Sequence, residues 1–220
     1  MNKRLIFNSI LSGSSRWMNY SYSQEGEDII LDNLLEGKSK GFYIDIGAYH
    51  PFRFSNTMRF YGRGWHGLNI DATPGSMKTF NKYRPRDINV EAAISDEGGK
   101  LAYYIFEEGA LNTFDADSLE RLKEHGYIPL NKIFVETYSI MDILDKYLKE
   151  DQEIDFMDID IEKFDEKVIS RMDFSRYKPT IIMIENLVEN EWGGVISNPV
   201  LLRAGYKMMA FTGRSAIYKK

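Results

Sequence analysis

The chain of 220 residues contains no cysteine, and its charge is not dominated by basic residues. Without cysteine there is no disulfide, no cysteine-ligated zinc and no thiol nucleophile. The composition fits the reducing cytoplasm, where we expect the protein to act. The net charge of −5 argues against a nucleic-acid partner, because such binding depends on neutralising phosphates. No segment approaches the ~18 apolar residues of a membrane-spanning helix, so we expect no membrane span.

The sequence also lacks internal repeats, low-complexity tracts and linkers rich in proline, glycine or serine. The length suits one domain, since α/β domains of about 200 residues are common. We therefore predict an N-terminal arm over residues 1–22 and a single domain over residues 23–220. A small insertion is expected at about residues 99–138, where 100–106 and 133–138 are typical of strands of an insertion or an edge hairpin.

Strand-like and helical segments alternate through the rest of the chain. Strands are expected at residues 42–46, 66–70, 88–94, 154–161, 180–184, 206–211 and 215–218, and helices at 29–35, 139–148 and 166–172. This alternation predicts an α/β fold with a doubly wound, mostly parallel sheet, and the tight turn at residues 212–214 requires one antiparallel strand. Ligands of such sheets bind at the carboxyl ends of the strands.

The turn after the first expected strand has one glycine, Gly47, and not the G-x-G-x-x-G spacing of a dinucleotide site. A diphosphate needs several glycines so that backbone N–H groups can approach it closely. S-adenosylmethionine carries no phosphate and needs an acceptor for its ammonium and an acid for its ribose. Asp45 and Gly47 suit its methionine end, and Asp71 at the end of the next strand suits the ribose.

These segments belong to a longer series of motifs that resembles the FkbM family of S-adenosylmethionine-dependent methyltransferases. The resemblance runs in family order from Ser23 to Glu185. It departs from the family pattern at Tyr49, Asp158 and Lys163. The motifs that carry it are Ser23-Gln24, Gly26-Glu27-Asp28, Gly41 to Ala48, His50-Pro51, Ser55-Asn56-Thr57, Arg63-Gly64-Trp65, Gly67, Ile70-Asp71, Ala93 to Asp96, Ile154-Asp155-Phe156 and Asp160-Ile161-Glu162.

The resemblance implies a class I methyltransferase (Rossmann-like) fold with seven strands, one of them antiparallel. It further implies O-methylation of a hydroxyl, or of a phosphate-type oxygen, on a sugar or surface-glycan precursor, as in polysaccharide modification. Carried over by position, the expected cofactor-binding residues are Asp45 and Gly47 in the first motif, Asp71 at the ribose, Ala93 and Ser95 beside the adenine, and Gln24 and Asn56 near the methionine end or the acceptor.

A sugar hydroxyl must lose its proton as it attacks the methyl group, so a general base is needed. His50 directly follows the cofactor turn and is largely neutral at pH 7. Asp160 and Glu162 near the end of a later strand are the other expected catalytic residues. Asp160 could instead hold Mg²⁺ or Ca²⁺ together with Glu185 and Asn186. We favour the interpretation in which Asp160 contacts the cofactor or acts as a base and no metal ion is bound.

A second enzyme class competes for the same residues. Asp158-Ile159-Asp160 is a D-x-D motif, which metal-dependent glycosyltransferases use to hold a nucleotide-sugar diphosphate. This motif falls late in the chain, and no basic cluster beside it could bind the phosphates. We therefore predict a methyltransferase that acts on a small-molecule or sugar substrate.

Overall fold

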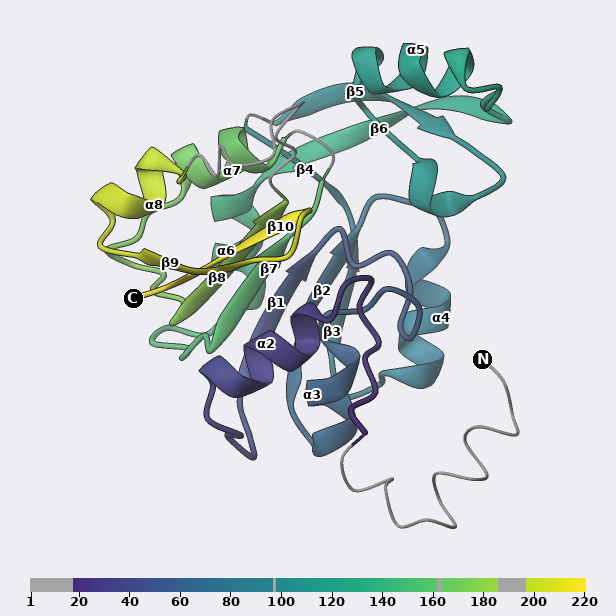
Figure 1. Cartoon of the computed structure of the whole chain (residues 1–220). Coiled ribbons are helices and arrows are strands. Elements are labelled where there is room, and N and C mark those ends of the chain that lie inside the picture. Colours follow the sequence, from purple (N-terminus) through teal and green to yellow (C-terminus); the bar gives the residue numbers. More distant parts are fainter. Residues whose placement is uncertain (1–17, 97, 162–163, 186–196) are drawn as a thin grey trace, which may run out of the picture.

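The computed structural model describes residues 18–96, 98–161, 164–185 and 197–220. Its main sheet has seven strands in the order β3-β2-β1-β7-β8-β10-β9, and β10 runs opposite to the other six (Figure 1). The strands are β1 (Phe42–Ile46), β2 (His66–Asp71), β3 (Ile88–Glu91), β7 (Phe156–Ile159), β8 (Ile181–Glu185), β9 (Lys207–Phe211) and β10 (Ser215–Lys219). This arrangement confirms the expected class I methyltransferase fold.

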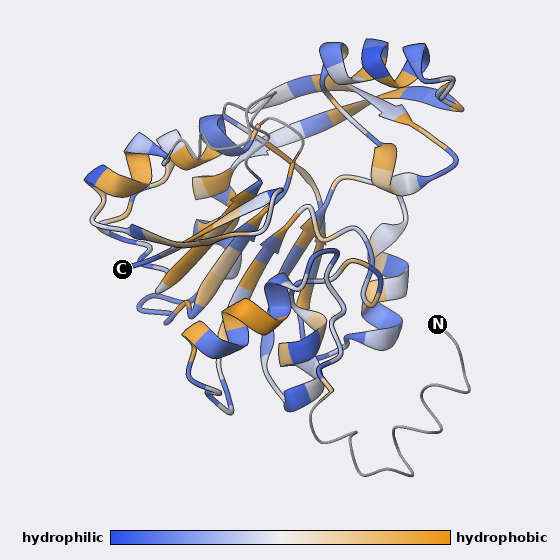
Figure 2. Cartoon of the chain, in the orientation of Figure 1, coloured by the Kyte–Doolittle hydropathy of each residue, from blue (hydrophilic) through white to orange (hydrophobic). Residues whose placement is uncertain are grey.

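Helices cover both faces of this sheet (Figure 1). Because side chains alternate along a strand, successive residues of β1 enter different cores. Ile44 packs in the core with α6, α7 and α8, whereas Tyr43 packs in the core with α2 and α3. Figure 2 shows the apolar residues concentrated in the central strands. The helices are α2 (Glu27–Leu34), α3 (Met58–Arg63), α4 (Ser76–Tyr83), α6 (Ile140–Tyr147), α7 (Asp165–Arg171) and α8 (Pro199–Arg203).

The strand expected at residues 88–94 divides into two at Ala92. β3 ends at Glu91 in the main sheet, and β4 (Ala93–Ser95) joins a second sheet of order β4-β6-β5. The backbone N–H of Ala92 still bonds to the Asp71 carbonyl oxygen at 3.0 Å, so the chain leaves the main sheet only after that residue. The periodicity of the sequence does not reveal this change, because Ile88, Val90, Ala92 and Ile94 alternate without a break across the division.

The expected insertion strands are present as β5 (Gly99–Ile105) and β6 (Asn131–Ser139), which pair antiparallel. They are joined by a short 3₁₀ turn, η2 (Gly109–Leu111), and by α5 (Ala116–Glu124) rather than by a tight turn. The second sheet and α5 extend beyond the end of the main sheet where its parallel strands finish (Figure 1). The insertion therefore lies beside the edge at which a ligand is expected.

The described part of the N-terminal segment lies against the main domain. The Ser55 N–H bonds to the Tyr22 carbonyl oxygen at 3.1 Å, and the Tyr22 N–H bonds to the buried Asp28 carboxylate at 3.0 Å. Gly26 is the N-cap of α2, and the Ser23 hydroxyl accepts the N–H of Asp28. The domain boundaries stay predictions. None of the described helices has the length and apolar character to cross a membrane.

Replacement of Gly67 by alanine should destabilise the fold. A Cβ at this position would lie 2.2 Å from a ring carbon of Tyr43 and 2.4 Å from its carbonyl oxygen. Such overpacking costs about 1–3 kcal/mol of unfolding free energy. At Gly62 in α3, an added Cβ would meet no atom within 4 Å, so Gly62→Ala should be neutral or slightly stabilising. Urea unfolding of both variants checks the prediction, and equal midpoints would contradict it.

Candidate active site

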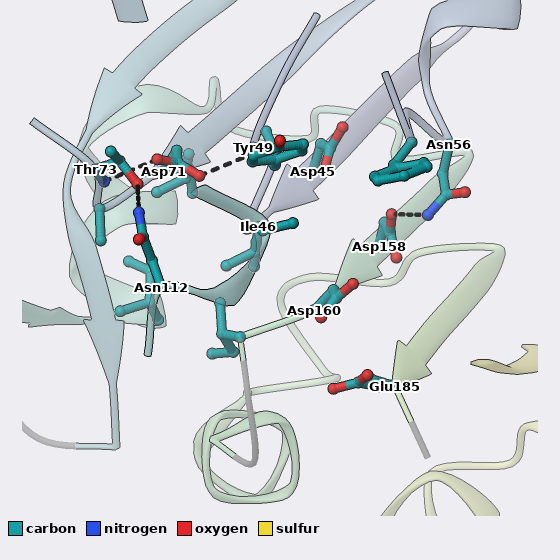
Figure 3. A pocket seen from close by; sticks show the side chains of 18 of the residues that line it. Asp45, Ile46, Tyr49, Asn56, Asp71, Thr73, Asn112, Asp158, Asp160 and Glu185 are labelled. Atoms are coloured by element: carbon teal, nitrogen blue, oxygen red, sulfur yellow. Dashed lines mark hydrogen bonds between the residues drawn. The ribbon is translucent and has the colours of Figure 1, made fainter. Parts of the chain in front are cut away.

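A cavity of about 160 Å³ opens at the carboxyl ends of β1, β2, β7 and β8 (Figure 3). It lies where the parallel strands finish, as expected for a doubly wound sheet. Its wall combines these strand ends with residues from the N-terminal segment, from the insertion and from the start of β10. The lining residues include Gln24, Glu27, Asp45, Gly47, Tyr49, Phe54, Asn56, Ile70, Asp71, Thr73, Ala92, Ile94, Tyr103, Asn112, Phe114, Asp158, Asp160, Glu185, Arg214 and Ser215.

Gly47 makes the turn that closes β1. Its φ of 89° lies in the left-handed region, which favours glycine. A Cβ here would lie 1.8 Å from the Asp160 carbonyl oxygen, so the backbone after β7 occupies the space of a side chain. The N–H groups of Gly47 and Ala48 both bond to the Ile70 carbonyl oxygen. Any larger residue would push the β1 and β7 ends apart.

Asp71 ends β2 with both carboxylate oxygens directed at backbone N–H groups. Oδ2 accepts from Tyr49 at 2.9 Å and Oδ1 accepts from Thr73 at 2.8 Å (Figure 3). Burial raises the pKa of Asp71, and the hydrogen bonds from Thr73 and Tyr49 act against that rise. The carboxylate thus fixes two loops around the cavity and keeps lone pairs for a ligand.

Three carboxylates gather at the other end of the cavity. Asp45 and Asp158 are direct partners in the parallel register of β1 and β7, so their side chains share one face. Thr57 donates to Asp45 Oδ2 at 2.6 Å, and the Asn56 amide donates to Asp158 Oδ2 at 2.7 Å. Asp160 follows directly after β7, and its side chain is exposed in the cavity wall.

The pKa values of this acidic cluster (Asp45, Asp158 and Asp160) are all raised. Burial raises the pKa of Asp45 to about 6, against the pull of Arg84 and of the Thr57 hydrogen bond. Burial and the charge of Asp45 raise the pKa of Asp158 well above its usual value. Although Asp160 keeps exposed surface, the surrounding protein and Asp45 raise its pKa to about 6. Three acids with raised pKa values in one cavity are typical of a functional site.

The apolar end of the cavity is where an adenine ring would fit. Its wall includes Ile70, Ala92 and Ile94, and Phe114 stacks on Tyr103 with ring centroids 4.3 Å apart. The structure does not bring the predicted Ala93 and Ser95 to this wall. Side chains alternate along β4, so their neighbours face the cavity instead.

His50 lies outside the cavity wall. Its Nδ1 accepts the N–H groups of Phe52 and Arg53 at 3.2 and 3.0 Å, which places the neutral ring's proton on Nε2. Burial, with a smaller contribution from Arg53, lowers the pKa of His50. This geometry gives the ring a role in shaping the loop after β1, and its catalytic role stays a prediction.

Of the other predicted site residues, Gln24, Asp45, Gly47, Asn56, Asp71 and Asp160 all line the cavity. Glu162 and Asn186 lie outside the described residues. Within the described ranges, no three histidine or acidic side chains are arranged so that they could hold a metal ion. The alternative metal site at Asp160, Glu185 and Asn186 stays untested, because Asn186 lies outside the described residues.

A family model described as the methyltransferase FkbM domain matches residues 45–208, which is more than half of the chain. The chain belongs to the FkbM methyltransferase family. The matching model is that of a methyltransferase domain, as the motifs implied. A search of curated proteins finds no match to this FkbM protein.

Solved structures similar to this FkbM protein are distant in sequence. Methyltransferase FkbM from Methylobacillus flagellatus KT has 12% identity and a TM-score of 0.48, over 83% of this chain and 44% of that one. The chain thus spans less than half the length of that protein. TehB from Haemophilus influenzae has 9% identity and a TM-score of 0.42, over 91% and 63% of the two chains. An O-methyltransferase from Bacillus cereus in complex with SAH has 12% identity and a TM-score of 0.41, over 100% and 92%.

The donor set of the cavity fits S-adenosylmethionine. Carboxylates of the acidic cluster suit its ammonium, Asp71 suits the ribose hydroxyls, and the apolar end suits the adenine. Asn56 Oδ1 is a buried oxygen that accepts no hydrogen bond from the described residues. Since buried polar atoms are nearly always satisfied, this oxygen suits a donor on a bound molecule.

The insertion supplies cavity residues that sequence reasoning missed. Tyr103, Asn112 and Phe114 all come from it, and Asn112 donates a long hydrogen bond of 3.4 Å to the Thr73 hydroxyl. Nothing in their local sequence signals this, because their position depends on how the second sheet folds back. The motif Ser55-Asn56-Thr57 is visible in the sequence, but the contact of Thr57 with Asp45 is not.

Replacing Asp158 by asparagine should stabilise the protein as the pH rises. The raised folded-state pKa means that the Asp158 contribution to stability is present at low pH and is lost from about pH 4 upward. Asp158→Asn should therefore gain stability relative to wild type between pH 4.5 and pH 7.5, and each kcal/mol of that gain should raise its Tm by about 2–4 °C relative to wild type. Thermal unfolding at the two pH values measures the difference.

Asp32 provides a control of opposite sign. The Arg63 hydrogen bond and charge lower its pKa, so this carboxylate stabilises the fold above its unfolded pKa and loses that effect as pH falls. Asp32→Asn should therefore lose stability relative to wild type as the pH rises from 3 to 7. Parallel pH profiles for wild type and Asp158→Asn would contradict the assignment of a raised Asp158 pKa.

Proposed function

We propose that this FkbM protein is an O-methyltransferase that acts on a hydroxyl, or on a phosphate-type oxygen, of a sugar or surface-glycan precursor in the cytoplasm. The observation that carries the proposal is the charge of the cavity. Among the described residues, its wall holds Glu27, Asp45, Asp71, Asp158, Asp160 and Glu185 against one basic residue, Arg214. Arg214 Nε is itself 3.3 Å from a Glu25 oxygen. Such a cavity suits a sulfonium cofactor and polyhydroxyl acceptor better than a diphosphate.

Different residues along the cavity would bind different parts of the cofactor. The cofactor supplies a methyl group already activated on a sulfonium. Asp45 would receive its ammonium and Asp71 its ribose hydroxyls, with Gly47 providing the close approach of the backbone between them. Gln24 and Asn56 lie at the acidic end and would orient the methionine part or the acceptor. Alignment of two reacting groups in this way supplies several kcal/mol of the rate acceleration.

Asp160 is the described residue best suited to be the general base. It is exposed in the cavity wall, and its pKa of about 6 lies close to the neutral pH at which a base works best. Glu162 and His50 remain the other predicted candidates. Because Nδ1 of His50 holds two backbone N–H groups, the free ring nitrogen carries the proton in the neutral form.

Calorimetric titration separates the methyltransferase from the glycosyltransferase alternative. S-adenosylhomocysteine should bind on its own, without any nucleotide-sugar present. Asp71→Asn should weaken S-adenosylhomocysteine about 10-fold to 100-fold, because a hydrogen bond to a charged group is lost. Methyl transfer to a panel of nucleotide-activated sugars and glycan fragments, read by mass, then identifies the acceptor. Binding of the nucleotide-sugar alone would overturn the proposal.

Two variants compare the candidate bases. Asp160→Asn should lower kcat by about 10²-fold or more, the usual loss for a general base, with a much smaller change in the Kd for S-adenosylhomocysteine. His50→Gln should lower kcat by less, since that ring acts on the loop backbone. The pH profile of kcat should fall below about pH 6 in wild type, because protonation of Asp160 removes the base. A larger loss from His50→Gln would make histidine the base.

A further inference from the structure

Arg84 is a buried cation that the proposed function does not use. It follows α4 directly, and none of its surface is exposed to solvent. Its Nε donates to Asp87 at 2.9 Å, and Nη2 donates to the Tyr43 hydroxyl at 2.7 Å and to the Thr57 hydroxyl at 2.8 Å. A guanidinium has only donors, so each of these partners must present an oxygen lone pair to it.

The contact with Thr57 reaches the cavity. Since the Thr57 hydroxyl accepts from Arg84, its single proton is free to be donated to Asp45 Oδ2, and the two oxygens are 2.6 Å apart. Arg84 therefore selects the direction of this hydroxyl. One oxygen of Asp45 is held by the protein, and the carboxylate, which lines the cavity, keeps the other for a ligand.

We propose that Arg84 is a positioning residue for the cofactor, which acts through Thr57 to hold the Asp45 carboxylate in the orientation that receives the cofactor's ammonium. This inference rests on the proposed cofactor site at Asp45. The charge of Arg84 acts in the same sense, because it opposes the rise that burial causes in the pKa of Asp45. A carboxylate that loses its proton more readily is a better partner for an ammonium.

The test changes Thr57, the residue that links Arg84 to Asp45, and uses two ligands. Thr57→Val removes the hydroxyl at nearly constant volume, and Thr57→Ser keeps it. S-adenosylhomocysteine carries the ammonium, whereas 5′-methylthioadenosine has the same nucleoside and no amino-acid part. Thr57→Val should weaken S-adenosylhomocysteine about 10-fold to 100-fold and leave methylthioadenosine within about 3-fold. Thr57→Ser should bind both ligands as wild type does.

A double-mutant cycle adds a readout that general damage to the fold would not give. In an Asp45→Asn background, Thr57→Val should cause little further loss, because the two side chains act as one unit. Equal weakening of both ligands by Thr57→Val, or no weakening, would overturn the proposal. If wild type binds neither ligand, the proposed cofactor site itself fails. Thr57→Ala serves the same comparison if the valine variant does not fold.

Discussion

The loops and strands around the candidate active site depend on the hydrogen bonds of one buried group, the guanidinium of Arg84. A charge without solvent access is stable only when its donors are satisfied. Arg84 meets this need by joining Tyr43 on β1, Asp87 before β3 and Ser55 and Thr57 before α3. Asp87 in turn accepts from Gly67 and Asn69 of β2. One cation thus connects three strands and the loop that carries the Ser55-Asn56-Thr57 motif.

On the same face of the sheet, acidic side chains that repel one another lie close together near that cation. The register of β1 with β2 and β7 places Asn69, Asp45 and Asp158 side by side. Apolar packing on both faces fixes this register, because a shift by one residue would expose the core of every strand. Apolar packing of the strands, and not any attraction between the acids themselves, therefore keeps the acidic side chains close together. Their raised pKa values follow from that constraint, and they leave the cavity ready for a cation and for proton transfer.

The sequence predicted those parts of the site that follow from local pattern. Asp45, Gly47 and Asp71 end buried strands, and parallel strands bring their ends together at one edge. The division of residues 88–94 between two sheets could not be predicted, because it depends on pairing with β6 far along the chain. The burial of Arg84 could not be predicted from the sequence either. It lies between the exposed Tyr83 and Pro85, so nothing in its neighbourhood indicates burial. Long-range contacts decide both features.

One end of the cavity is apolar and the other is acidic, and the insertion forms part of the apolar end. Tyr49 after β1 donates to Glu108 at 2.8 Å, and Arg53 forms a two-point ion pair with the same carboxylate. These contacts are exposed and individually weak, but they join the insertion to the first loop of the site. Phe114 and Tyr103 then close the apolar end, while the acidic cluster and Glu185 stay at the ends of β1, β7 and β8. In the proposed orientation of the cofactor, the adenine would lie under the insertion and the ammonium among the acids, so the insertion would determine which end of the cavity each part occupies.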